Sequence, residues 1–296
     1  MKLISAKTIL GLSALLLTAA CTDEQVENPA DGARAISFTS ATETRAAVEG
    51  NTLPGNFKVW GGYEGNAINV FNGETVQHPN WTYTGGTQYW IPGKTYNFYG
   101  VYPTSVNALC DENGTLTVSG FNCYKTGNEA VDLMTASQTG ISYAAGVEPQ
   151  SVSMQFGHEL ARVNVVATVE GGDATVTNIV FAGMATSGNY SSTVGWSNTA
   201  TGSFANLTPQ TLNAEGVDLL GDMLLIPQAV SGFTLTVDYT VGGIAQPQRV
   251  ITLPTTISQW DKGKSYKYTL SFKRNRLTVT VKVVDWNEED TSVSWG

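Results

Sequence analysis

Apolar and polar residues alternate along much of the chain. This spacing places every second side chain on one face, as in a β-strand with one face toward a core. The segments with this pattern are 57–61, 96–101, 152–156, 163–169, 233–239, 266–272 and 277–283. Gly-Gly, Asn-Gly and Lys-Gly pairs occur between many of these segments, and such pairs favour turns. Each segment is therefore predicted to be a strand.

The same pattern predicts an all-β fold of two tandem β-sandwiches. No stretch has the apolar spacing of a long amphipathic helix, and strands spaced in this way favour sandwiches over βαβ units. A sandwich takes about 100 to 120 residues. We therefore expect residues 46–150 and 151–296 to be separate domains, with the boundary near Pro149.

Composition narrows the class of protein. The chain is acidic, with a net charge of −9 and a pI near 4.7. This charge disfavours nucleic acid and anionic membrane surfaces as partners. Only 14% of the residues are charged, and there are 31 glycines. Together with the recurring Thr, Val, Ser and Tyr, this composition is typical of an extracellular all-β protein with many turns.

The N-terminal segment 1–20 is predicted to be a signal peptide. Lys2 and Lys7 precede an apolar run, 9–20, that is too short to span a bilayer. The run ends in "LLLTAAC", which resembles the lipobox of bacterial lipoproteins, whose cysteine is acylated, with palmitate for example, and becomes the mature N-terminus. Cys21 is thus the expected lipidation site. The alternative is an ordinary secretory leader with an incidental cysteine.

Cys110 and Cys123 flank a turn followed by a short strand. Two alternatives are open for them. A disulfide would stabilise the chain by about 3 kcal/mol for a loop of this size, and an oxidising envelope would permit it. Two buried free thiols are the other outcome, since a bridge needs the two Cα atoms within about 7 Å.

The sequence contains little that points to catalysis. Its only histidines, His78 and His158, are far apart, and no Cys/His set has zinc spacing. There is no phosphate-binding loop before a helix and no nucleophile elbow. We therefore expect no metal, no cofactor and no enzyme activity. His158 is expected to be a core or interface histidine with one hydrogen bond, and the acidic run 285–290 a solvated turn rather than a calcium loop.

Six further segments occur in order along the chain: "YWIPGKTYNFYGVYP" (89–103), "DLMTA" (132–136), "VSMQFGHELARVNVVATV" (152–169), "MLLIPQ" (223–228), "WDKGKSYKYTLSF" (260–272) and "VKVVDW" (281–286). Together they resemble the fimbrillin family of Bacteroidetes, the subunits of type V pili. The resemblance implies two transthyretin-like sandwiches. It also implies a lipoprotein precursor that reaches the cell surface and is cut after an arginine by a trypsin-like protease.

Arg45 stands where the family's processed arginine would be, so the mature chain would begin at Ala46 and 21–45 would be a propeptide. Ile36 and Phe38 alternate with polar residues in this propeptide. They predict a removable strand that fills a groove until the cut. Arg34 is a second candidate, less favoured because cleavage there keeps the strand. The alternative is that Arg45 is an ordinary linker residue.

The C-terminal segment 277–296 is the predicted donor strand for a neighbouring subunit. Its alternating apolar residues are Leu277, Val279, Val281, Val283, Val293 and Trp295. Each would contribute about 1.5–3 kcal/mol in an apolar groove, before the cost of ordering. An unpaired sheet edge accepts such a strand through main-chain hydrogen bonds. The alternative is that this segment is the last strand of its own sandwich.

The sequence thus predicts a structural subunit of a surface fimbria, at the cell outer membrane, that supports adhesion. Its expected partners are other fimbrial subunits, in a homo- or hetero-polymer, an Arg-specific protease, the outer membrane through the precursor's lipid, and a host glycan or protein. No nucleic acid is expected. The alternative is a non-polymerising surface lipoprotein or a fimbrial tip adhesin that binds glycan or host protein.

Overall fold

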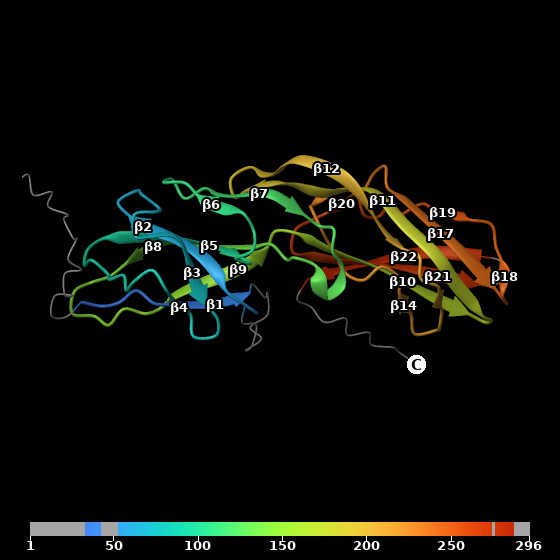
Figure 1. The fold of residues 1–296 in the computed structure, drawn as a ribbon, viewed down its shortest axis with the longest axis horizontal. Helices are drawn as coiled ribbons and strands as arrows, with labels where there is room; N and C mark the ends of the chain where they lie inside the picture. Colours follow the sequence, from blue (N-terminus) through green and yellow to red (C-terminus); the bar gives the residue numbers. More distant parts are fainter. Residues whose placement is uncertain (1–32, 43–52, 274–275, 287–296) are drawn as a thin grey trace, which may run out of the picture. The chain divides into compact units, whose positions relative to one another are not determined.

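The described chain is built almost entirely of strands (Figure 1). The structure is a computed structural model that describes residues 33–42, 53–273 and 276–286. A seven-stranded sheet contains, in spatial order, β1 (Phe38–Thr42), β9 (Val152–His158), β8 (Met134–Ser142), β5 (Thr95–Tyr102), β2 (Phe57–Tyr63), β3 (Phe71–Gln77) and β4 (Thr82–Tyr83). Its neighbouring strands are antiparallel, except that β1 runs parallel to β9.

Two further sheets contain most of the remaining strands. The five-stranded sheet consists of β14 (Val217–Asp218), β10 (Ala161–Glu170), β21 (Lys264–Lys273) and β22 (Arg276–Asp285), with β15 (Met223–Leu225) also on β10. The eight-stranded sheet consists of β18 (Ile244–Ala245), β17 (Thr234–Val241), β11 (Ala174–Ser191), β7 (Leu116–Asn122) and β6 (Ala108–Cys110), with β12 (Gly195–Asn206) and β13 (Gln210–Thr211) on β11 and β19 (Arg249–Ile251) on β17. A ribbon of β16 (Gln228–Ala229) and β20 (Gln259–Trp260) and a 3-10 turn, Gly127–Glu129, complete the described elements.

The larger hydrophobic core joins residues of the five- and eight-stranded sheets. Val165 and Leu270 come from β10 and β21, while Ile179 and Val237 come from β11 and β17, and all are at most 1% exposed. Each strand buries alternate residues, as expected for a sheet with one face on a core. This is the packing of a β-sandwich.

A smaller core lies on one face of the seven-stranded sheet. Phe57, Phe98 and Phe156 are fully buried in it. β5 contributes to both cores, because Phe98 and Val101 stand on opposite faces of the strand and Val101 belongs to the larger core. The two cores are therefore separated by a single layer of backbone at β5.

The all-β prediction is confirmed, and each of the seven alternating segments forms a strand. The division into domains 46–150 and 151–296 stays a prediction. The described residues from Arg34 onward belong to one compact unit. Within it β9, which follows the predicted boundary, pairs with β1 and β8.

Candidate functional site

β1 is an edge strand of the seven-stranded sheet (Figure 1). Its inward side chains lie in the smaller core. Ile36, just before the strand, is 2% exposed, and Phe38 is 3% exposed. Ser37 and Thr39, on the other face, are exposed. The alternation predicted at the sequence level is therefore present in the folded chain.

Main-chain hydrogen bonds hold this segment on two sides. The Ile36 amide donates to the Gln88 carbonyl at 2.8 Å. The Val152 amide donates to the Ser37 carbonyl, also at 2.8 Å. The Tyr83 hydroxyl donates to the carbonyl of Ile36 at 3.0 Å, and burial raises the pKa of Tyr83 above its usual value, so this hydroxyl stays a donor.

The ring of Phe38 fits into an aromatic pocket. Its centroid lies 5.3 Å from Phe71, 5.7 Å from Phe98, 6.0 Å from Tyr83 and 6.4 Å from Phe57, all in edge-to-face geometry. Such pairs add to the free energy gained by burying the ring. Burial of the two inward side chains of the segment contributes about 3–6 kcal/mol together.

β1 can leave without breaking any pair between the other strands. It pairs from Phe38 opposite Val152 to Thr42 opposite Phe156, and β9 is its only strand neighbour among the described residues. Parallel neighbours are never joined by a tight hairpin, so no short turn ties the two together. Withdrawal would expose the main-chain edge of β9 and the aromatic pocket. We call this space the β1 groove.

Two buried polar groups in the smaller core and β1 have no hydrogen-bond partner among the described residues. Ser40 continues the inward side of β1, and its Oγ is buried without a hydrogen-bond partner among the described residues. The same holds for Nε1 of Trp90, a residue that is 4% exposed in the smaller core. A buried polar group left without a partner costs about 1–3 kcal/mol.

Arg45 and Ala46 lie outside the described residues, between the end of β1 at Thr42 and Leu53. Leu53 is fully buried in the smaller core. A cut between these two points would therefore put β1 and the rest of its core on different fragments.

Arg34 lies before β1 and is held by its neighbours. Its carbonyl accepts a hydrogen bond from the Trp90 amide at 2.9 Å, and its Nε lies 2.8 Å from Glu148 Oε2 in an exposed ion pair. A cut after Arg34 would leave Ile36 and Phe38 on the main fragment.

The predicted donor residues Leu277 to Val283 lie in β22, which pairs with β21 of the same chain. The antiparallel ladder runs from Lys273 opposite Arg276 to Lys264 opposite Asp285. β22 is the edge strand of its sheet. Val283 is 39% exposed, while Leu277, Val279 and Val281 pack partly buried against the larger core. Val293 and Trp295 lie outside the described residues.

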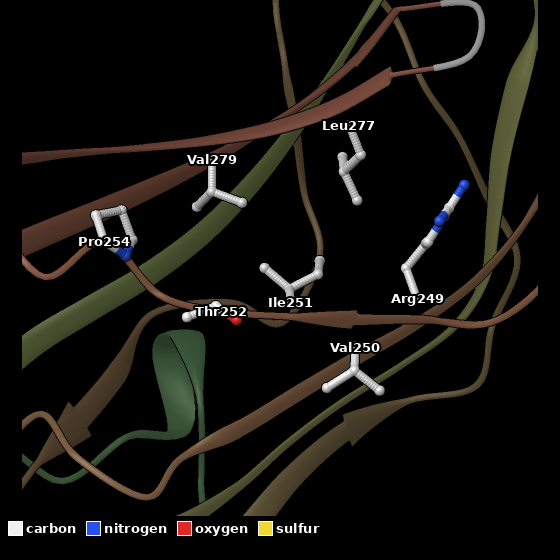
Figure 2. A pocket seen from close by; sticks show the side chains of 7 residues that line it. All are labelled: Arg249, Val250, Ile251, Thr252, Pro254, Leu277 and Val279. Carbon is white, nitrogen blue, oxygen red and sulfur yellow. The ribbon is translucent and has the colours of Figure 1, made fainter.

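A groove of about 540 Å³ opens between β22 and the segment that starts at β19 (Figure 2). In Figure 2, Leu277 and Val279 extend from β22 toward Ile251 on the opposite side. Arg249 and Pro254 lie at its two ends. The sandwich is thus open at this edge, with apolar side chains on both walls.

A comparison with known protein families shows to which family the chain belongs. The family model for fimbrillin-like proteins matches residues 30–286. The chain belongs to the fimbrillin-like family. No curated protein matches its sequence.

Solved structures share the fold of this fimbrillin-like chain. A candidate cell adhesion protein from Bacteroides uniformis has a TM-score of 0.59 and 20% identity, over 87% of this chain and 100% of that one. Another candidate cell adhesion protein, from Bacteroides ovatus, has a TM-score of 0.59 and 14% identity, over 88% of this chain and 100% of that one. A fimbrial protein from Bacteroides vulgatus has a TM-score of 0.54 and 18% identity, over 85% of this chain and 99% of that one. At these identities the likeness extends to the fold alone.

His158 is a core histidine, as predicted. Its Nδ1 lies 2.8 Å from Asp132 Oδ2, and its ring stacks on Trp286 with a centroid distance of 4.1 Å and an interplanar angle of 5°. Trp286 is the last described residue. The stack therefore fixes the point from which the C-terminal tail of this fimbrillin-like chain departs.

Cys110 and Cys123 are free and buried, so of the two alternatives left open by the sequence the pair of buried thiols holds and the disulfide does not. The register explains why. Cys110 pairs opposite Leu116, and Cys123 lies seven positions beyond Leu116. At about 3.3 Å per residue the two are roughly 20 Å apart, too far for a bridge. Burial raises the pKa of both thiols to about 12.

Some residues of the β1 groove had no signal in the sequence. The hydroxyl of Tyr83 and the carbonyl of Gln88 hydrogen-bond to Ile36, yet both residues lie in a turn-rich stretch without clear alternation. Within the described part of the chain, no helix is long and apolar enough to cross a membrane, and no group of three His, Cys, Asp or Glu could hold a metal ion.

Proposed function

We propose that this chain is a structural subunit of a surface fimbria, matured by cleavage after Arg45 and polymerised by donor-strand exchange. The observation that carries the proposal is β1, a parallel edge strand that precedes Arg45 and buries Ile36 and Phe38 in an aromatic pocket. Membership of the fimbrillin-like family supports assembly with other fimbrial subunits.

Cleavage after Arg45 turns a tethered strand into a bound peptide. Before the cut, β1 is joined to Leu53 through the chain and its effective concentration at the groove is high. After the cut it is held only by its own contacts, weakened by the unpartnered hydroxyl of Ser40. A strand from another copy can then compete for the same edge of β9. Because such a head-to-tail contact does not close on itself, it produces a filament.

The C-terminal tail has the pattern needed to replace β1. Val293-Ser294-Trp295 matches Ile36-Ser37-Phe38 in type: a β-branched residue, a serine and an aromatic residue. Val293 and Trp295 would therefore enter the positions of Ile36 and Phe38. The long ladder between β21 and β22 supports a donor that begins after Trp286, because a donor that included 277–285 would have to give up that ladder.

The remaining features of the precursor complete the proposal. Residues 1–20 act as signal peptide, Cys21 carries lipid in the outer membrane, and an Arg-specific protease removes 21–45 at the cell surface. If the chain consists of two tandem domains, the pairing of β9 with β8 favours a boundary after His158 rather than near Pro149.

The test uses the precursor from residue 21 with Cys21→Ser, incubated with an Arg-specific protease. We expect a product that begins at Ala46, followed by SDS-resistant ladders. Arg45→Ala should abolish both, whereas the matched control Arg34→Ala should leave both unchanged. A synthetic peptide of residues 34–42, in excess, should inhibit the ladders because it competes for the groove.

Deletion of 287–296 separates the donor from the acceptor. The shortened chain should still be cut at Arg45 and should form no ladders by itself. Ladders that persist after this deletion would refute the tail as donor, and an uncut wild-type chain would refute the maturation step.

The second candidate is a non-polymerising surface lipoprotein or tip adhesin. The pairing of β22 within its own chain favours it, because it assigns residues 277–285 to an ordinary last strand. A cut chain that stays monomeric and binds glycan or host protein, with or without 287–296, would support this candidate.

A further inference from the structure

A second pocket, of about 630 Å³, lies far in sequence from the β1 segment. It is open to solvent and is lined by residues of β5, β7, β8, β9 and β11 and by Gly114, Glu159, Ser192 and Lys262 outside these strands. One lining residue, Gln155 of β9, stands opposite Ala41 of β1. Its lining residues include Tyr99, Thr135, Ser137, Gln138, Gln155, Glu159, Tyr190, Ser192 and Lys262. This volume falls in the range of small-molecule sites.

The charges in this pocket neutralise one another. Glu159 is 5% exposed, and its carboxylate accepts hydrogen bonds from Thr135 Oγ1 at 2.7 Å and from Lys262 Nζ at 2.9 Å. The Tyr190 hydroxyl also hydrogen-bonds to Glu159. Because Glu159 and Lys262 are the charged members of the lining and form one pair, the pocket offers no excess charge to an ionic ligand.

Neutral polar groups remain available for a ligand. Ser137 is exposed on β8 and stands opposite Tyr99 of β5, on the face of the sheet that lines the pocket. Gln155 donates from Nε2 to Ser153 at 2.8 Å, which leaves its carbonyl oxygen free to accept. These groups stand on two adjacent strands, β8 and β9, and present both donors and acceptors.

Tyr99 supplies an aromatic wall in a defined position. Gly114 has a φ of +84°, and a Cβ built there would lie 2.2 Å from Tyr99 Cζ, so the ring packs directly on glycine backbone. Burial raises the pKa of Tyr99, which keeps its hydroxyl protonated. A ring with a polar edge beside amide and hydroxyl groups suits a ligand that has both apolar faces and hydroxyls.

We propose that this pocket binds a neutral saccharide. A sugar ring offers C–H faces to the tyrosine and hydroxyls to the serine and glutamine side chains, without a charge that the pocket would have to match. A peptide fits less well, because few apolar side chains in the lining could receive its anchors. The proposal goes beyond the assembly of subunits.

The test begins with the chain from residue 21 carrying Cys21→Ser, on an array of neutral and sialylated oligosaccharides. We expect binding to neutral oligosaccharides. Ser137→Trp, which fills the pocket, and Gln155→Ala should each lower the binding at least tenfold. Gln77→Ala, an exposed change on β3 outside the lining, should leave it unchanged.

Thermal melts of the variants check that each is folded, and Ser137→Trp should still form SDS-resistant ladders after cleavage. That readout separates this pocket from the β1 groove. Binding of no oligosaccharide, binding restricted to sialylated ones, or equal binding by Ser137→Trp would each overturn the proposal.

Discussion

Phe38→Ala should destabilise the uncut precursor strongly and the mature chain not at all. The ring is 3% exposed and touches four other aromatic rings at centroid distances of 5.3–6.4 Å. Replacing such a buried Phe by Ala costs about 3–5 kcal/mol, from the lost burial and from the cavity that remains. The mature chain that we propose begins at Ala46 and lacks residue 38, so the same substitution should have no effect there.

Urea unfolding followed by tryptophan fluorescence measures this difference in the precursor with Cys21→Ser. The free energy of unfolding should fall by about 3–5 kcal/mol in Phe38→Ala. Thr39→Ala, on the exposed face of the same strand, should change it by less than about 0.5 kcal/mol. The two mature chains, from wild type and Phe38→Ala, should unfold at the same urea concentration. A loss below about 1 kcal/mol in the precursor would refute the packing of β1 in the core.

Three further predictions follow from single contacts. Ser40→Ala should stabilise the precursor by about 1 kcal/mol and raise its melting temperature, because the change removes a buried hydroxyl without a hydrogen-bond partner. It should also slow ladder formation, because β1 is then held more firmly. An unchanged melting temperature would contradict this prediction. Cys110 and Cys123 should not react with a thiol reagent at pH 8 until urea is added. Burial raises their pKa to about 12 in the folded chain from an ordinary value of 9.0, so the unfolded chain loses its thiol protons at a lower pH. The free energy of unfolding should therefore fall above pH 9.0; rapid labelling of the folded chain would speak against their burial. Lys262→Met should lower the free energy of unfolding in urea by about 1–3 kcal/mol, because it leaves the Glu159 carboxylate without its cation. Adding Glu159→Gln should recover part of this loss. Equal stability of the wild type, the single variant and the double variant would count against the ion pair.

The local part of the fold could be read from the sequence. Alternation at 163–169 and 266–272 appears as buried and half-buried positions in β10 and β21. Ile36 and Phe38 were predicted to face a groove, and both are buried. Period-two patterning is visible in a single segment because side chains on a strand alternate between its faces whatever its partner is.

The partners of these segments could not be read in the same way. Ile36 and Phe38 belong to a segment whose neighbour, β9, begins at Val152, more than a hundred positions away. The sequence also left open whether the segment from Leu277 is the last strand of its own sandwich or a donor for another subunit. In this structure the segment pairs with β21 of the same chain. Strand pairing depends on which main-chain edges meet, and every edge offers the same N–H and C=O groups.

The sequence by itself determined the strands with alternating patterns, their inward faces, the acidic charge and the position of Arg45 after a short alternating segment. The tertiary structure alone decided that this segment lies on β9, that Cys110 and Cys123 are too far apart to bridge, and that Glu159 meets Lys262 beside free amide groups. The reason is physical: the inward or outward direction of a side chain is set by its own strand, whereas proximity between distant residues is set by the joint packing of many strands around shared cores.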